Sequence, residues 1–319
     1  MSTDRKMEVR LRKICLEADS IASFEFVAAD GQALPGFTAG AHIDLYLPGE
    51  RVRSYSLVND PCETHRYLIA VQKEQDGRGG SAWMHSSPRV GDLFTISAPA
   101  NDFPLADEAS ASVFLAGGIG ITPVFSMLSR LNYLGRPWAL HYGSRSPDHA
   151  AFADELRSAA GQNGSIDFRF GAGGGGRLDV ANIVRNAPSD AHLYCCGPRS
   201  MIDDFLTACT GRPQSHVHYE RFAAAQQLAT DGGFDVVLKR SGRSIAVAAG
   251  KTILDSLLDN GVSVQYACSA GVCGTCRTSV LEGEPEHRDD YLTDAEKLEN
   301  RSIMICCSGS KSKTLVLDL

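Results

Sequence analysis

Hydrophobic and polar residues follow a period of two along the first third of the chain. Between residues 7 and 105, apolar and polar positions alternate in short runs such as AHIDLYL, RSYSLV, YLIAVQ and LFTISAP. Such runs, rich in β-branched and aromatic residues and separated by turn residues, are typical of antiparallel strands. This segment therefore predicts an antiparallel β-barrel.

From Ser112 onward the pattern becomes an apolar strand, a glycine turn and a helix, three times over. SVFLAGG precedes TPVFSMLSRLNYLG, WALHYGS precedes a helix near residues 150–160, and AHLYCCG precedes PRSMIDDFLTAC. Strands that alternate with helices predict an α/β fold with a parallel sheet and crossover helices.

The last part of the chain has a third organisation. Two short strands, FDVVLK and SIAVAA, and a helix, TILDSLLDN, lead into a cysteine-rich loop, and ATDGG has the composition of a linker. A chain of 319 residues is too long for one ordinary core. We therefore expect three domains, at residues 1–107, 108–228 and 229–319.

Composition and charge exclude several classes of function. A hydrophobic content of 43% and a charged content of 22% indicate a globular protein. The net charge of -7, with no block rich in lysine or arginine, argues against nucleic acid and anionic membranes as partners. MSTDRKMEVR lacks the apolar segment of a signal peptide, and the longest apolar run is broken by glycines and a proline. We expect a cytoplasmic protein without a membrane span.

Ten cysteines in a reducing compartment indicate metal binding, redox chemistry or burial, not disulfides. We expect Cys15, Cys62 and Cys209 to be small buried residues. The stretch CSAGVCGTC, by contrast, has the spacing C-x4-C-x2-C, and another cysteine follows in IMICCSG, at Cys306 or Cys307. Four thiolates with this spacing are the ligands of a plant-type [2Fe-2S] cluster.

Glycines at positions 271 and 274 support the cluster interpretation, because glycine accepts the positive φ that a loop needs to turn its amides toward sulfur. The alternative is a zinc site, but zinc modules more often pair two C-x2-C units. Residues 229–319 resemble a plant-type ferredoxin domain, which implies an α+β β-grasp fold. The CCS sequence matches the family's C-x-S ending, so the resemblance favours the ligand set Cys268, Cys273, Cys276 and Cys306.

A one-electron cluster does not accept a hydride, so we expect a second redox cofactor upstream. RSYSL, residues 53–57, offers an arginine for a phosphate, a tyrosine face for a ring and a serine hydroxyl. GRGGSAWMH places Gly79, Gly80 and Ser81 where a helix begins, which suits a phosphate. Alone, each motif is also explained by an amphipathic strand or a simple loop, but together they predict a flavin site.

Two glycine turns in the middle of the chain predict a dinucleotide site. FLAGGIGITPVFSML differs from the G-x-G-x-x-G fingerprint, because Pro123 occupies the place of the last glycine. It still predicts a tight turn after a buried strand, with Thr122 as N-cap and Pro123 as the first helical residue. CCGPRSM repeats this arrangement at the carboxyl edge of the sheet, where ligands bind in open α/β folds. A plain strand-to-helix connection is the alternative for this second turn.

In this order, the segments resemble the phthalate dioxygenase reductase and vanillate demethylase reductase family of the ferredoxin-NADP reductase superfamily, over essentially the whole chain. The resemblance implies that FMN is held by Arg53, Ser54, Tyr55, Ser56, Gly79, Gly80 and Ser81 and lined by Ala70, Val71 and Lys73. It implies that the nicotinamide dinucleotide is held by Gly117, Gly118, Gly120, Thr122, Pro123, Cys196, Gly197 and Pro198, with Arg145 near the adenosine end. Phe222 is expected to cover the flavin. Ser56 and Cys196 are expected to position the reactants, and no residue is expected to act as a general acid or base.

The resemblance further implies a reductase component that passes electrons from NADH through FMN and a [2Fe-2S] cluster to a terminal Rieske non-haem iron oxygenase in aromatic degradation. A cytochrome P450 or a diiron oxygenase is an alternative acceptor. A redox-sensing module is the alternative from another class, but a sensor needs no hydride-donor site. NADH is favoured over NADPH because Arg145 stands nearly alone beside Asp148, and the family implies a monomer. Gly309 stands where the family commonly has an arginine, so docking to the partner differs here if that arginine contacts it.

Overall fold

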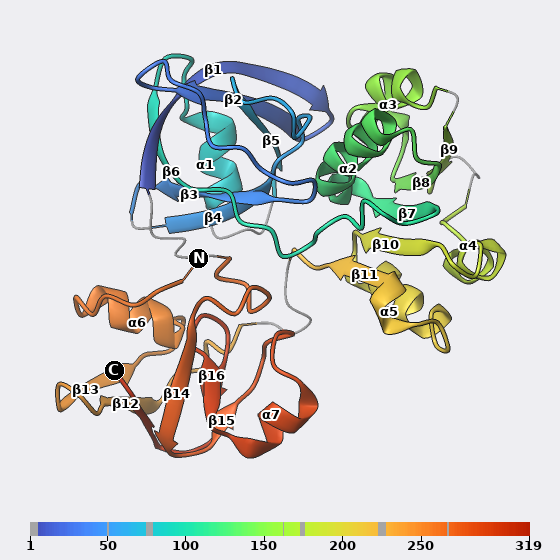
Figure 1. Ribbon diagram of the computed structural model, residues 1–319. Helices are drawn as coiled ribbons and strands as arrows, with labels where there is room; N and C mark the ends of the chain where they lie inside the picture. Colours follow the sequence, from blue (N-terminus) through green and yellow to red (C-terminus); the bar gives the residue numbers. More distant parts are fainter. Residues whose placement is uncertain are drawn as a thin grey trace. The chain divides into compact units, whose positions relative to one another are not determined.

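The computed structural model describes residues 6–49, 51–74, 79–161, 163–172, 176–222, 228–266 and 268–319 (Figure 1). The chain divides into two compact units, Met1–Arg221 and Phe222–Leu319, and the first unit contains two separate sheets. In the part of the chain with described structure, no helix combines the length and the apolar character needed to cross a membrane. The domain boundaries at residues 107 and 228 stay predictions.

The first sheet has six antiparallel strands in the order β4-β3-β6-β1-β2-β5. The elements of this part are β1 (Lys6–Ala18), β2 (Ile21–Ala28), β3 (His42–Leu47), β4 (Arg51–Ser56), β5 (Tyr67–Gln72), α1 (Gly80–Ser86) and β6 (Leu93–Ser97). Directly after β4, Leu57 pairs with Ile69 of β5, and the amide of Val58 donates to Leu68 O at 2.8 Å. These bonds join the two edge strands, so the predicted β-barrel is confirmed. Alternate residues of β3 point inward because side chains alternate along a strand.

The second sheet has five parallel strands in the order β11-β10-β7-β8-β9. The elements are β7 (Ser112–Gly117), η1 (Gly118–Gly120), α2 (Ile121–Leu134), β8 (Trp138–Ser144), η2 (Pro147–His149), α3 (Ala153–Ala159), β9 (Gly164–Phe170), α4 (Val180–Asn186), β10 (His192–Cys196), α5 (Arg199–Ala208), η3 (Gln214–His216) and β11 (Val217–Glu220). Helices α2 and α3 pack on one face, and α4 and α5 pack on the other. The predicted α/β fold is confirmed.

Helix α2 joins the barrel to the parallel sheet. Val124 and Met127 of α2 belong to one buried cluster with Val58 and Ala70 of the barrel. In the same region the Gly40 amide donates to the Ser126 hydroxyl at 3.1 Å. Because this cluster is continuous and apolar, the first turn of α2 is held beside strand β5.

The second unit contains a mixed five-stranded sheet in the order β13-β12-β18-β14-β16, in which β12 and β18 are parallel and the other pairs antiparallel. Its elements are β12 (Phe234–Leu238), β13 (Arg243–Val247), α6 (Ile253–Asp259), β14 (Arg277–Glu282), β15 (Pro285–Glu286), α7 (Asp294–Glu299), β16 (Ser302–Met304), β17 (Gly309–Ser310) and β18 (Thr314–Leu317). Thr252 and Asp255 form a capping box that starts α6. This helix packs its apolar side into the core of the sheet, as an α+β ferredoxin domain requires.

The cysteines outside the CSAGVCGTC loop are less uniform than expected. Cys209 is buried, but Cys15 is only partly buried and Cys62 is exposed. Cys62 lies in a turn in which its amide donates to Asp60 Oδ1 at 2.8 Å, so it follows the polar turn and not a strand facing the core. The expectation of burial was therefore wrong for Cys62.

Candidate functional site

The glycine turn after β7 begins a helix, but not as the sequence suggested. Gly118–Gly120 forms a 3₁₀ turn that runs directly into α2, and Gly120 is the N-cap. The Thr122 hydroxyl donates to Ile119 O at 3.0 Å instead of accepting from a helical amide. Thr122 is therefore not the N-cap and Pro123 is not the first helical residue, because the 3₁₀ turn moves the start of the helix to Ile121.

The two predicted dinucleotide turns pack against each other backbone to backbone. A Cβ atom on Gly120 would lie 2.2 Å from Cys196 O, and one on Gly197 would lie 2.9 Å from Gly117 N. A Cβ on Gly117 would lie 2.5 Å from Cδ of Pro198. Since β7 and β10 are neighbours, their carboxyl ends bring both turns to one edge of the sheet. The structure thus unites these residues in a surface of bare backbone that only glycine permits.

Strand β11 adds a residue that the sequence analysis missed. Glu220 ends β11 beside Cys196, whose thiol donates to Glu220 Oε2 at 4.0 Å. Burial, together with the charge of Asp102, raises the pKa of Glu220 to about 8. Burial also raises the pKa of the Cys196 thiol well above its usual value. Both groups therefore carry protons near neutral pH, so the Cys196 thiol is not a thiolate nucleophile.

A position at the end of a parallel strand was the only sequence signal for Glu220. Arg145 follows the end of β8, where it is exposed and its backbone oxygen accepts from the Ala172 amide at 2.7 Å. Arg145 therefore lies at the same carboxyl edge of the parallel sheet as the glycine turns. Phe222 is 41% exposed and begins the second compact unit, so its relation to the flavin residues stays a prediction.

The residues predicted for the flavin phosphate meet where β4 faces α1. A Cβ on Gly80 would lie 2.8 Å from Nε of Arg53, and one on Gly79 would lie 2.9 Å from Nη1 of Arg51. Gly79 has a φ of 77° and precedes α1. The Ser81 hydroxyl accepts from the Glu74 amide at 3.1 Å. Two guanidinium groups therefore border this turn, and their charge suits a phosphate.

Tyr55 shares a face of β4 with Arg53, because residues two apart lie on the same side of a strand. Burial raises the pKa of Tyr55 to about 12 despite the nearby charge of Arg53, so the ring is a neutral phenol. Ser54 points to the other side, where its hydroxyl donates to Asp44 Oδ1 at 2.6 Å. Ser56 is buried. The structure thus brings Arg53, but not the Ser54 hydroxyl, to the Gly79–Gly80 turn.

Two of the three residues of β5 and its end that were predicted to line the flavin have side chains buried in hydrophobic clusters. Ala70 belongs to the cluster shared with α2, and Val71 belongs to the barrel core. Lys73 is exposed beyond the end of β5, and its amide donates to Ser20 O at 2.7 Å. Ala70 and Val71 can therefore offer mainly backbone atoms to a ligand.

The cysteine loop has the geometry that its glycines predicted. Gly271 and Gly274 have φ values of 73° and 78°. The Ala270 amide donates to Sγ of Cys268 at 3.3 Å, so an amide of the loop does turn toward sulfur. A loop of this kind leaves little room for side chains, since a Cβ on Gly271 would lie 2.6 Å from Sγ of Cys307.

The thiols of the three loop cysteines and of Cys306 face one another. Hydrogen bonds from Cys273 and Cys306 lower the pKa of Cys268, and a hydrogen bond from Cys306 lowers the pKa of Cys276. Among the described residues, no three histidine, cysteine or carboxylate side chains are grouped to hold a single metal ion. The thiols form a row of contacts instead: Cys273 meets Cys268, Cys268 meets Cys306, and Cys306 meets Cys276.

The neighbouring Cys307 has a different environment. Its Sγ lies 3.7 Å from Met304 O and 3.7 Å from the Ser308 hydroxyl. Cys306, and not Cys307, makes the contacts with Cys268 and Cys276. Cys306 thus faces the thiols of the cysteine loop, and the glycine-lined loop with its facing thiols fits a binuclear iron–sulfur group.

Comparisons with known proteins agree with this architecture. Residues 114–206 match the family model "Oxidoreductase NAD-binding domain", and residues 236–310 match "2Fe-2S iron-sulfur cluster binding domain". The β subunit of phenoxybenzoate dioxygenase from Ectopseudomonas oleovorans is 50% identical over 100% of this chain and 99% of its own length. The match to the iron–sulfur family excludes the zinc alternative for the cysteine loop.

Two solved structures are also similar. Phthalate dioxygenase reductase has a TM-score of 0.85 and 37% identity, covering 99% of this chain and 98% of its own. Full-length CYP116B46 from Tepidiphilus thermophilus has a TM-score of 0.72 and 38% identity, covering 99% of this chain and 42% of its own. This chain belongs to the phthalate dioxygenase reductase family, in which flavin- and nicotinamide-binding domains precede a C-terminal plant-type [2Fe-2S] ferredoxin domain.

Proposed function

We propose that this protein delivers electrons from NADH to a Rieske non-haem iron oxygenase, with FMN as its flavin. The chain is an NADH-dependent oxidoreductase, the reductase subunit of an oxygenase system. The observation that carries the proposal is the presence, on one chain, of a nicotinamide domain, a flavin barrel and four facing thiols. When bound, the flavin supplies two-electron chemistry and the iron–sulfur centre supplies one-electron chemistry.

We assign the protein's own groups the following roles. Arg53 and Arg51, at the Gly79–Gly80 turn, hold the flavin phosphate, and Tyr55 offers its neutral ring to the flavin. The interlocked turns at Gly117–Gly120 and Cys196–Pro198 hold the dinucleotide, with Arg145 toward its adenosine end. Cys196 and Glu220, both protonated, hold the nicotinamide end in place without accepting a proton from it.

Cys268, Cys273, Cys276 and Cys306 are the proposed ligands of the iron–sulfur centre. Four thiols in contact with one another supply the number of ligands that two tetrahedral irons need, two for each iron. The amide that faces Cys268 stabilises negative charge on sulfur, because a hydrogen bond to the charged form favours it. Cys307 remains a neighbour that fills the space beside Gly271.

The acceptor is proposed by similarity. One similar protein is a subunit of phenoxybenzoate dioxygenase, and another is the reductase of phthalate dioxygenase, so the names of both include an oxygenase. The match to CYP116B46 favours a cytochrome P450 as the second candidate acceptor. The final substrate belongs to the oxygenase, and the cytoplasmic location and monomeric state stay predictions.

The deciding experiment is an anaerobic absorbance titration with NADH, followed by chromatography of the released flavin. Flavin and iron–sulfur bands that both bleach, with FMN released on denaturation, are the expected result. The reduced protein is then mixed with a purified Rieske oxygenase or with a cytochrome P450. Reduction of the P450 but not of the Rieske centre would replace the first acceptor by the second, and an iron–sulfur band that stays oxidised while the flavin bleaches would refute the electron path.

A further inference from the structure

Asp289 is a carboxylate buried beside the cysteine loop, and the roles assigned above do not use it. Its side chain is 0% exposed. Oδ2 accepts from the Leu292 amide at 2.8 Å and from the Tyr291 amide at 3.2 Å. Oδ1 accepts from the Ser308 hydroxyl at 3.4 Å and lies 3.7 Å from Nδ1 of His287. A buried carboxylate with this many partners holds its own chain segment in a fixed turn.

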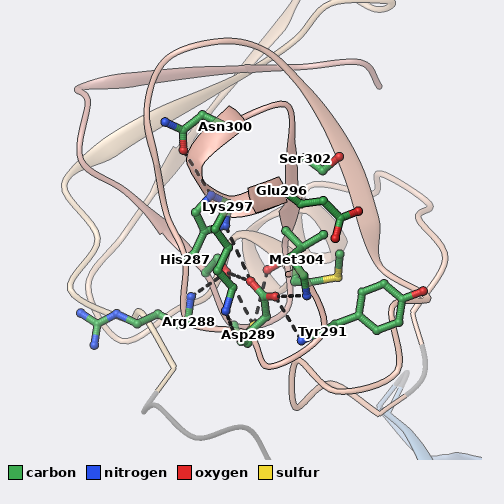
Figure 2. Close-up of polar contacts among 12 residues, drawn as sticks. His287, Arg288, Asp289, Tyr291, Glu296, Lys297, Asn300, Ser302 and Met304 are labelled. Atoms are coloured by element: carbon green, nitrogen blue, oxygen red, sulfur yellow. Dashed lines mark hydrogen bonds and ion pairs between the residues drawn. The ribbon is translucent and has the colours of Figure 1, made fainter. Parts of the chain in front are cut away.

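Figure 2 shows His287, Arg288, Tyr291 and Lys297 gathered around Asp289. The Lys297 ammonium group donates to the backbone oxygen of Asp289 at 2.6 Å, which ties α7 to the same turn. Nε2 of His287 lies 3.2 Å from Oδ1 of Asn300, the residue that ends α7. The 287–292 segment is therefore held in place both by the side chain of Asp289 and by residues of helix α7.

This segment lies directly on the loop that carries three of the proposed ligands. The Asp290 amide donates to Gly271 O at 3.0 Å. A Cβ on Gly271 would lie 3.2 Å from Cα of Asp289, and one on Gly274 would lie 2.2 Å from the ring of Tyr291. Gly271 stands between Cys268 and Cys273, and Gly274 stands between Cys273 and Cys276. Both positive-φ glycines of the loop thus contact the 287–292 segment.

The same segment also contacts the region of the fourth proposed ligand. Strand β15 pairs with β17 through Glu286 and Gly309, so residues after β15 and before β17 lie side by side. Ser308, 0% exposed, donates to Asp289 Oδ1 and accepts from the Arg288 amide at 3.1 Å. Ser308 is two residues from Cys306. Asp289 therefore connects both parts of the chain that supply cysteines.

We propose that Asp289 is a positioning residue for the iron–sulfur centre, which it serves by holding the cysteine loop and the Cys306 segment in register. The inference rests on the ligand set proposed above. Groups that orient metal ligands without touching the metal typically change metal retention by about 10- to 100-fold when removed. Loss of the Asp289 carboxylate frees the Tyr291 and Leu292 amides and the Ser308 hydroxyl together, so an effect in this range is expected.

The test uses the full-length protein with both cofactors and measures iron released to a chelator under nitrogen, together with visible circular dichroism of the cluster. Asp289→Ala is expected to release iron about tenfold faster than the wild type or more, with an altered visible spectrum. Asp289→Asn keeps the shape and one acceptor oxygen, so it is expected to fall between the two. If the alanine variant does not fold, the comparison of Asp289→Asn with the wild type serves as the test.

Two controls separate positioning from general instability. Asp235→Asn removes an exposed carboxylate from β12 of the same unit and is expected to behave as the wild type. Val236→Ala removes buried methyl groups from the same strand and lowers the unfolding temperature without touching the 287–292 segment. The inference holds if Asp289→Asn loses iron faster than Val236→Ala at equal or smaller loss of unfolding temperature. It is overturned if iron release in all variants follows the unfolding temperature alone and the visible spectrum is unchanged. A wild-type protein that purifies without iron would overturn the proposed ligand set and this inference together.

Discussion

Replacing Glu220 by glutamine is expected to remove a pH dependence of stability that this one carboxyl group confers. Its pKa in the folded protein is raised to about 8 by burial and by Asp102, from an ordinary value of 4.5. The folded state thus holds a proton that the unfolded state has released between these two values. The stabilisation of the folded state by this proton is fully present below pH 4.5 and is lost as the pH rises through about 8.

The size of the effect follows from the shift. Between about pH 6 and about pH 9 the wild type crosses roughly two pKa units of differential protonation, each worth about 1.36 kcal/mol, so the limit is about 2.7 kcal/mol. Burial is the main cause of the shift, but Glu220 keeps some contact with solvent, so we take about 2 kcal/mol of this limit. For a unit of this size, about 1 kcal/mol corresponds to roughly 2–4 °C in the unfolding temperature. The wild type should therefore lose about 4–8 °C relative to Glu220→Gln over this range.

The assay is differential scanning calorimetry of the two proteins at matched pH and scan rate. Titration of all other groups is common to both proteins and cancels in the difference. Relative to Glu220→Gln, the unfolding temperature of the wild type should fall as the pH rises from about 6 to about 9, because the folded wild type loses the Glu220 proton in this range and glutamine has none to lose. A difference that stays constant across this range would show that Glu220 is ionised in the folded protein, and the role assigned to its proton would be withdrawn.

Three further predictions concern the cofactor sites. Gly120→Ala places a methyl group 2.2 Å from Cys196 O, so it should cost about 1–3 kcal/mol in stability and raise the KM for NADH, whereas Gly36→Ala, which meets open space, should do neither. Arg53→Ala should release flavin on gel filtration while leaving the iron content unchanged, and equal loss of both cofactors would point to misfolding. Cys306→Ser should abolish the iron–sulfur absorbance that Cys307→Ala retains, and the reverse pattern would make Cys307 the fourth ligand.

The elements that sequence predicted best are those with a strict local signature. Period-two runs gave the barrel, alternation of strand and helix gave the parallel sheet, and Gly271 and Gly274 predicted the turns of the cysteine loop, because each pattern is set by neighbours in the chain. The start of α2 was mispredicted at Thr122, because the sequence does not distinguish a 3₁₀ turn that leads into a helix from the N-cap of that helix.

Other features depend on residues that are distant in sequence. The proton on Glu220 requires burial at the sheet edge and the charge of Asp102, more than a hundred residues earlier, so no local pattern reports it. The proposed role of Asp289 depends on Ser308, which reaches it when β15 pairs with β17, and on Gly271, which reaches it through the amide of Asp290. Buried polar groups of this kind can be identified only once the tertiary structure is known.

The backbone contact between Gly120 and Cys196 also limits how coenzyme preference can change in this protein. A side chain at Gly120 would require the 3₁₀ turn to move away from the end of β10, so we expect changes of coenzyme preference at the periphery of the proposed nucleotide site. Arg145 and Asp148, in the chain that follows β8, are both exposed, so substitutions of these side chains meet no comparable steric constraint. A conversion from NADH to NADPH is therefore most readily reached by introducing basic residues there, with the centre of the site unchanged.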